Sequence, residues 1–353
     1  MDIGVYDFET YGLGGELSLL GAYDGRQVSF FHTPKQLINY FIDSDIQFWY
    51  AHNGGAYDIK YLLPELKENH FIRYILIHNS LNLKEYESSR DRTRKNRDGS
   101  VHEYVEYQNC RFELRDSFLL LHDSLENLSG AEGFDTEHKK LPYDDYEEHK
   151  DKKLLLEYAT NDLLALYEVL TAFKNELLND DHPRLYMTAA ATAMNVFKKS
   201  YGGAAWLKSI GDNHEIYRNG YYGGRCEVVR RYGQNLHYYD INSLYPSVML
   251  TEQYPLGESV FVRERVPDTL GYYKVKAYAP EDLHIPVLPF RDESKKLLFP
   301  TGTFEGWYYS PELDLAEQMG YVIEVQGGYV WFETHNPFVP YIEHYYDIKQ
   351  HST

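Results

Sequence analysis

Hydrophobic positions in the N-terminal half of the chain fall into short apolar blocks, alternating stretches and helical stripes. Two strand-like stretches flank Asp24-Gly25, which is a strong signal for a two-residue hairpin turn. Pro34 suits the first turn of a helix, where a missing backbone N–H costs nothing. The predicted strands are 3–8, 17–23, 26–31, 46–51, 72–77 and 101–116, and the predicted helices are 34–43, 57–66, 151–178 and 188–199.

The segment 151–178 has the clearest helical pattern in the chain. Its stripe repeats at spacings of three and four residues, at Leu155, Tyr158, Asp162, Ala165 or Leu166, Val169 and Phe173. Asp180-Asp181 and then Pro183 end this helix. We therefore expect an N-terminal domain of residues 1–180 and a C-terminal domain of residues 181–353.

The order of the predicted elements indicates an α/β fold. Three strands in a meander are followed by a helix, a strand and another helix, which suits a mixed sheet flanked by helices. The chain has 353 residues, of which 43% are hydrophobic, enough for two domains with cores. No apolar run approaches the roughly 20 residues of a membrane span, and no signal peptide is evident. Cys110 and Cys226 match no metal spacing and favour a reducing compartment: cytoplasm, organellar matrix or, for a viral protein, the host cytoplasm.

The net charge of −19 weighs against a broad phosphate-binding surface. Local basic patches remain, at Arg90–Arg97 and Arg225–Arg231. The first patch precedes Asp98-Gly99, so the alternative interpretation is a solvated hairpin tip.

Four acidic residues lie in or beside apolar stretches that we expect to be buried. Asp7 and Glu9 are two apart on a strand, so both point to one face. Asp58 opens a predicted helix, and Asp162 lies one turn beyond Tyr158 on the apolar stripe. Each has a structural alternative: a polar strand end, a helix cap and a Tyr–Asp hydrogen bond in the core.

A buried carboxylate requires a proton, a basic partner or a metal ion. Taken together, the four acids predict a site for two Mg²⁺ or Mn²⁺ ions that would activate water and hold the leaving oxygen of a phosphodiester. Around this site, Thr10 and Asn53 are candidates for hydrogen bonds to the substrate and Tyr57 for stacking on a base.

These residues resemble the motifs of the family B DNA polymerases, in particular the protein-primed branch of phages, linear plasmids and organelles. The proofreading domain of that family carries DxE, NxxxYD and YxxxD motifs, which match Asp7–Glu9, Asn53–Asp58 and Tyr158–Asp162. The resemblance implies a ribonuclease H-like 3′–5′ exonuclease domain that degrades single-stranded DNA ends.

The same resemblance implies further residues of the nuclease site. Ser124 and Leu125 match positions that contact the single-stranded end. A lysine that steadies phosphate charge is matched by Lys140, with Lys139 as the alternative. A tyrosine that follows the lysine is matched by Tyr146, with Tyr143 as the alternative.

Downstream motifs resemble the start of a polymerase domain. Tyr221-Tyr222-Gly223-Gly224 is similar to the YxGG motif, in which Tyr221, Gly223 and Gly224 would contact primer–template DNA. Asp240–Ser247 (DINSLYPS) is similar to polymerase motif A, delivered by a predicted strand at 236–239. By resemblance Asp240 binds catalytic metal, Ser243 and Leu244 meet the triphosphate, and Tyr245 packs under the sugar of the incoming dNTP.

Motifs B and C of the family do not occur, so we do not expect residues 1–353 alone to polymerise DNA. The leading hypothesis is the N-terminal part of a protein-primed DNA polymerase, with an incomplete α+β palm region and proofreading activity. Two alternatives are a stand-alone exonuclease with a relic palm, and half of a split polymerase that acts as an interaction module. The expected partners are DNA, dNTP in the full-length enzyme, and a terminal protein or C-terminal polymerase half; no membrane partner is expected.

Overall fold

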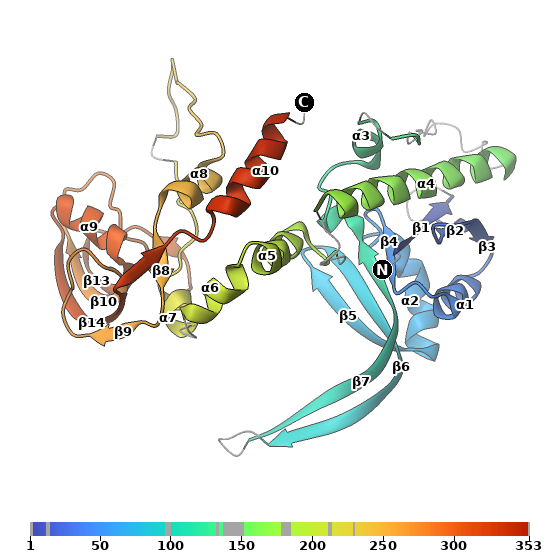
Figure 1. Ribbon diagram of the computed structural model, residues 1–353, viewed down its shortest axis with the longest axis horizontal. Coiled ribbons are helices and arrows are strands. Elements are labelled where there is room, and N and C mark those ends of the chain that lie inside the picture. The colour runs from blue at the N-terminus through green and yellow to red at the C-terminus, as the bar shows by residue number, and fades with distance from the viewer. Residues whose placement is uncertain are drawn as a thin grey trace. The chain divides into compact units, whose positions relative to one another are not determined.

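The computed structural model describes residues 3–11, 15–95, 100–131, 134–136, 152–177, 185–210, 214–228 and 230–351. The chain forms two compact units, Met1–Val196 and Phe197–Thr353 (Figure 1). The division between these two units falls within helix α5 (Ala189–Ser200).

A seven-stranded mixed sheet forms the centre of the first unit, with the strand order β3-β2-β1-β4-β7-β6-β5. Strand β1 is parallel to β4, which is parallel to β7, and the other neighbours are antiparallel. The predicted meander and mixed sheet are therefore confirmed. The strands are β1 (Ile3–Thr10), β2 (Leu17–Tyr23), β3 (Val28–Phe31), β4 (Phe48–Ala51), β5 (Phe71–Ile77), β6 (Ser80–Lys95) and β7 (Val101–Asp116).

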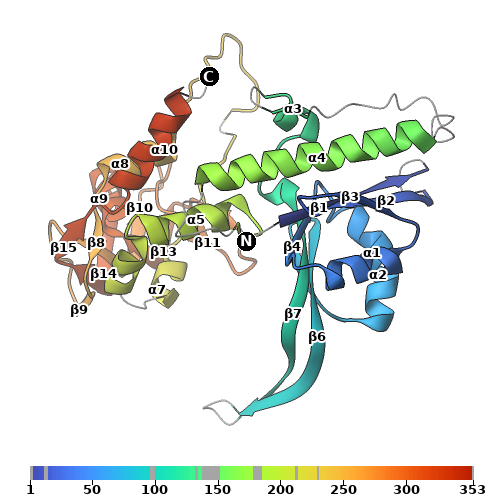
Figure 2. The same ribbon diagram turned by 45° about the vertical axis from the view of Figure 1, so that its right-hand side comes forward.

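Helices cover both faces of this sheet (Figure 2). Helices α1 (Pro34–Asp43) and α2 (Asp58–Asn69) pack on one face, in a core that includes Leu20 of β2. Helix α4 (Lys152–Leu177) packs on the other face, where Leu155 and Ala159 contact Leu19. Adjacent β2 residues thus enter opposite cores, as strand alternation requires. A 3₁₀ turn (Ser117–Leu119) and α3 (Leu125–Ser129) follow β7.

Strands β6 and β7 extend well past the sheet. Strand β5 pairs with β6 only as far as Tyr86, and β4 pairs with β7 only from Glu113 onward. Beyond these points the two strands pair only with each other, as a two-stranded ribbon to Lys95 and Val101 (Figure 1). Sequence reasoning missed β6, because the basic run in its second half has no apolar face.

The second unit contains a four-stranded sheet in the order β13-β10-β14-β9, whose three pairings are all antiparallel. Its core gathers Tyr273 and Val275 of β10, Tyr308 of β13 and Leu313 of α9. The elements are α6 (Gly203–Ser209), α7 (His214–Asn219), α8 (Leu244–Thr251), β8 (Tyr254–Leu256), β9 (Val260–Val262), β10 (Leu270–Ala279), β11 (Phe290–Arg291), β12 (Leu297–Leu298), β13 (Gly302–Tyr309), α9 (Ser310–Gln318), β14 (Val322–Trp331), β15 (Glu333–His335) and α10 (Val339–His351).

The strand predicted at 236–239 is wrong. Residues 230–242 have no regular secondary structure, and the side chains of Tyr238 and Tyr239 are 94% and 86% exposed. A strand needs a partner for its backbone N–H and C=O groups, and no strand in the described part of the chain pairs with this segment. Asp240 is accordingly exposed on an extended segment rather than held at a sheet edge. Among the described residues, no helix is both long and apolar enough to span a membrane.

One close contact in the first core gives a stability test. A Cβ on Gly4 of β1 would come within 2.4 Å of the buried Trp49 ring. We expect Gly4→Ala to lower the free energy of unfolding by about 1–3 kcal/mol, because the ring lies in a packed core and has little room to shift. Urea denaturation measures this. Gly223→Ala, where a Cβ meets nothing within 4 Å, is the control, and an equal loss in both variants would contradict the packing argument.

Candidate active site

Three carboxylates from β1 and α4 converge in the first unit. Ligand oxygens of Asp7, Glu9 and Asp162 lie within 4.8 Å of one another. Asp7 and Glu9 occupy alternate positions of β1 and so project to the face that α4 covers. Asp162 follows Leu155 and Ala159 along α4, on the side that packs against the sheet, and it is 6% exposed.

Burial and repulsion from neighbouring acids make Asp7 hard to ionise without a cation. The pKa of Asp7 is raised well above its ordinary range by burial and by the charges of Glu9, Asp58 and Asp162. Such a like-charged group is unfavourable in the folded protein unless positive charge enters it.

Asp58 belongs to the same electrostatic neighbourhood, although its oxygens are not part of the three-acid group. It is the first residue of α2 and is 6% exposed. Burial, helped by the charge of Asp116, raises its pKa to about 7. Hydrogen bonds from the backbone of Asp58 and Phe8 act in the opposite direction. The structure therefore brings three predicted acids into one cluster, with the fourth close enough to raise the pKa of Asp7.

The turn that leads into Asp58 is fixed by buried contacts that sequence reasoning missed. The carboxylate of Asp116, at the end of β7, accepts hydrogen bonds from the Ser80 hydroxyl at 2.6 Å and the Gly55 N–H at 3.3 Å. A Cβ on Gly55 would lie 2.0 Å from the Ser80 Oγ, so only glycine permits this close approach. Asn53 begins the turn with a left-handed φ of 58° and is exposed.

His52 connects this turn to the segment after β7. Its Nδ1 lies 3.1 Å from the Ser117 Oγ and its Nε2 lies 3.0 Å from the Asp123 carbonyl oxygen. Ser124 caps α3 by accepting a hydrogen bond from the Asn127 N–H at 3.2 Å, and Leu125 is partly buried. His52 thus holds the predicted Ser124–Leu125 segment near the Asn53 turn. In the sequence, only the position of His52 next to Asn53 pointed to this role.

Tyr158 lies one helical turn before Asp162, as predicted. Its pKa is raised by burial, by the charges of Asp162 and Glu9, and by a hydrogen bond to Asp162. The hydroxyl therefore stays protonated, and it donates its proton to the Asp162 carboxylate. Thr10 ends β1 and is partly buried, and Tyr57 is 45% exposed, with the Lys60 Nζ 5.5 Å from its ring centroid. Lys140 and Tyr146, with their alternatives Lys139 and Tyr143, lie outside the described residues.

The donor set suits a hard divalent cation. Carboxylate oxygens are the ligands that Mg²⁺ and Mn²⁺ prefer. Three acidic side chains, Glu9, Asp58 and Asp162, raise the pKa of Asp7, so positive charge is favourable among them. The residues present therefore fit the metal ions that the sequence predicted.

The predicted polymerase motifs lie together in the second unit, on exposed backbone. A Cβ on Gly224 would be 3.8 Å from the Tyr245 hydroxyl, and the Tyr221 carbonyl accepts a hydrogen bond from Arg291 at 2.9 Å. Ser243 precedes α8 with a φ of 51°, and its hydroxyl accepts a hydrogen bond from the Lys349 Nζ at 3.1 Å. Gly223, Asp240, Leu244 and Tyr245 are exposed, and no metal-like cluster includes Asp240 in the described ranges.

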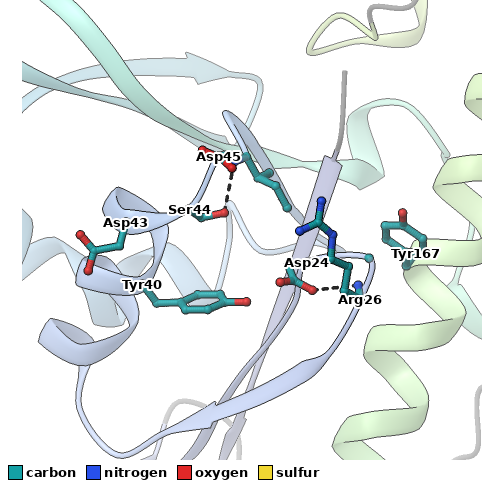
Figure 3. A pocket seen from close by; sticks show the side chains of 9 residues that line it. Asp24, Arg26, Tyr40, Asp43, Ser44, Asp45 and Tyr167 are labelled. Carbon is teal, nitrogen blue, oxygen red and sulfur yellow. Dashed lines mark hydrogen bonds between the residues drawn. The ribbon is translucent and has the colours of Figure 1, made fainter.

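The first unit also contains a cleft away from the acid cluster, and the acids that line it form no metal-like cluster among the described residues (Figure 3). It has a volume of about 470 Å³ and lies between the Asp24-Gly25 turn, the end of α1 and Tyr167 of α4. The Asp24 Oδ1 accepts hydrogen bonds from the Arg26 and Gln27 N–H groups, both at 2.8 Å. These bonds outweigh burial and lower the pKa of Asp24, so this acid is committed to its turn.

Comparison with known proteins shows consistent likenesses. A family model described as DNA polymerase type B, organellar and viral, matches residues 38–153 and 149–353. A probable DNA polymerase of Neurospora intermedia is 34% identical over 219 residues, which cover 57% of this chain and 22% of that protein. A DNA polymerase of Kluyveromyces lactis is 25% identical over 353 residues, covering 83% of this chain and 34% of that protein. The chain thus spans about a fifth to a third of these relatives.

Among solved structures, phi29 DNA polymerase complexed with primer-template DNA and incoming nucleotide substrates superimposes with a TM-score of 0.74. The match covers 100% of this chain and 64% of that one, at 16% identity. The likeness shows that the mixed α/β fold is shared with that polymerase.

The repulsion within the acid cluster gives a second stability test. Asp7→Asn should raise the free energy of unfolding in the absence of divalent cations by on the order of 1 kcal/mol near neutral pH, because it removes a carboxyl group that folding must either keep charged among other acids or force to bind a proton. Thermal unfolding in a chelator measures this. The same variant should gain less than the wild type from added Mn²⁺. A metal-free loss of stability in Asp7→Asn would contradict the assignment.

Proposed function

Because this chain belongs to the organellar and viral family of type B DNA polymerases, we propose that it is the part of a protein-primed, DNA-directed DNA polymerase that carries metal-dependent 3′–5′ proofreading. In this proposal residues 1–180 are a ribonuclease H-like exonuclease domain and residues 181–353 begin the polymerase domain. The observation that carries the proposal is the approach of the Asp7, Glu9 and Asp162 carboxylates to within 4.8 Å.

The nuclease role follows from what these side chains do. Asp7, Glu9, Asp58 and Asp162 would hold two divalent cations, and the chemistry supplied there would be a more acidic water and positive charge for the leaving oxygen. The Tyr158 hydroxyl, which donates to Asp162, would accept a hydrogen bond from the water and so orient it for attack on the terminal phosphorus. The bond from phosphorus to the 3′ oxygen breaks, that oxygen takes a proton, and a nucleoside monophosphate leaves. Lys140 is proposed to steady the phosphate charge.

The proposed substrate is a frayed, single-stranded 3′ end of DNA. Thr10, Asn53 and Tyr57 would contact it from the end of β1 and from the turn before α2, and Ser124, Leu125 and Tyr146 from the segments after β7. The contacts of His52 with Ser117 and Asp123 support this proposal, because they hold the turn before α2 next to the segment that follows β7.

In the second unit we assign the exposed motif to DNA synthesis in the full-length enzyme. Asp240 would bind metal, Ser243, Leu244 and Tyr245 the incoming dNTP, and Tyr221, Gly223 and Gly224 the primer–template. The exposure of Tyr238 and Tyr239, at 94% and 86%, favours a second candidate role, in which this segment docks a further polymerase part or a terminal protein.

The nuclease assignment is tested with a labelled single-stranded oligonucleotide and Mg²⁺ or Mn²⁺. Replacing Asp7 by Asn and Glu9 by Gln should reduce release of 3′ nucleotides at least about a hundredfold, because two of the four carboxylates proposed to hold the cations are lost. Asp24→Asn is the matched control: it alters an acid of the separate cleft and should keep activity. Equal activity of the double variant and the wild type would remove the proposed site.

Tyr158→Phe separates orientation of the water from metal binding. The variant retains the ring and loses only the hydroxyl, so the rate should fall about tenfold or more while the dependence on Mn²⁺ concentration stays unchanged. Steady-state rates across a Mn²⁺ titration measure both quantities. A shift of the Mn²⁺ midpoint with an unchanged maximal rate would assign Tyr158 to the metal site instead.

A further inference from the structure

The outer part of the β6–β7 ribbon has two chemically different faces. Cross-strand partners in an antiparallel pair project to the same side. Arg90 pairs with Glu106, Arg92 with Tyr104 and Arg94 with His102, so these six residues share one face, which we call the arginine face. The other face holds Asp91 opposite Val105 and Thr93 opposite Glu103.

The arginine face concentrates positive charge that the ribbon itself does not use. Arg90, Arg92 and Arg94 are all exposed. Arg92 forms an ion pair with Glu106 at 2.8 Å, a surface pair of small energetic value. In the described residues, neither Arg90 nor Arg94 has an ion pair. Arg90 lies opposite Glu106, but Arg92 and Arg94 lie opposite aromatic rings, so this face carries three arginines against one glutamate and the like charges repel along it.

Two aromatic rings on β7 lie directly across from two of these arginines on β6. The His102 and Tyr104 rings are stacked, with centroids 6.3 Å apart and planes 12° from parallel. Tyr104 is 41% exposed and His102 is also exposed. Here, beyond the last contact with the sheet, neither ring contributes to the core of the first unit. A basic strip with interleaved exposed aromatic rings is the chemistry that binds single-stranded nucleic acid, with phosphates on the cations and bases stacked on the rings.

The spacing of the arginines supports the same partner. Residues two apart on a strand are about 6.8 Å apart, so the three side chains present a line of charge that can follow a flexible phosphate backbone. The chain as a whole carries −19 and repels DNA at long range. A local strip of positive charge offsets this repulsion where single-stranded DNA lies against the ribbon.

We propose that the arginine face of the β6–β7 ribbon is a binding surface for single-stranded DNA, separate from the acid cluster. Arg90, Arg92 and Arg94 bind phosphates, and the His102–Tyr104 pair provides a stacking platform for a base. The surface adds a hold on the strand away from the carboxylates, and its action requires no cleavage.

The test is binding of a labelled oligo-dT of about 20 nucleotides, long enough for one such site, to the full chain. Fluorescence anisotropy is measured in a chelator between about 50 and 200 mM salt. Replacing Arg90, Arg92 and Arg94 by Gln should weaken binding about tenfold or more. It should also reduce the slope of log affinity against log salt by about 2, since each phosphate contact on a single strand contributes about 0.7.

The matched control removes the same charge elsewhere in the first unit. Arg26, Lys35 and Lys67 are exposed, and their combined replacement by Gln should leave the salt slope within about 0.5 of the wild type. Tyr104→Ala should weaken binding about tenfold and Tyr104→Phe should retain it, because stacking needs the ring and not the hydroxyl. Circular dichroism confirms that each variant folds.

Two results would overturn the proposal. One is equal affinity and salt slope for the arginine variant and its control. The other is an arginine variant that binds oligo-dT as tightly as the wild type but loses binding to a labelled duplex of the same length. That result would assign the face to double-stranded DNA. The nuclease proposal is tested separately, by release of 3′ nucleotides in Mg²⁺ or Mn²⁺. Binding in chelator involves no cleavage, so either proposal can fail while the other holds.

Discussion

The packing of α4 across β1 and β2 is the constraint on which the proposed chemistry depends. Leu155 and Ala159 contact Leu19 of β2 in a small apolar core on one face of the sheet. Burial of this surface, at roughly 25 cal/mol per Å², helps to offset the repulsion that arises when the same helix brings Asp162 beside Asp7 and Glu9. If the helix moved along the strand by one turn, the apolar contacts and the carboxylate cluster would both be lost.

Elements whose side chains repeat with a clear period were predictable. Strand β1 and helices α1 and α4 have the expected boundaries to within two residues, because each has one face in a core. Strand β6 was not predictable, since its outer half is polar on both sides and is held by its pairing with β7 rather than by an apolar core. The strand expected at 236–239 failed for the opposite reason: its aromatic residues have the composition of a strand, but the described chain provides no partner.

The acid cluster was predicted and its supports were not. A carboxylate in an apolar stretch is visible in the sequence, and so is a tyrosine one turn before it. The hydrogen bonds that hold the turn before Asp58 join residues far apart: Asp116 contacts Ser80 and Gly55 across 36 and 61 positions, and His52 contacts Ser117 across 65. No periodic pattern encodes contacts of that range, so only the folded chain identifies them.

Backbone strain falls at both proposed DNA-facing turns. Asn53 and Ser243 have φ values of 58° and 51°, in the left-handed region that costs a non-glycine residue about 1 kcal/mol. Asparagine adopts this region readily, and serine less so. Asn53 begins the turn that leads into α2, whose first residue is Asp58, and Ser243 immediately precedes α8, which begins with Leu244 and Tyr245. In both units, therefore, the fold maintains a costly turn to aim a helix start, which stability alone would not select.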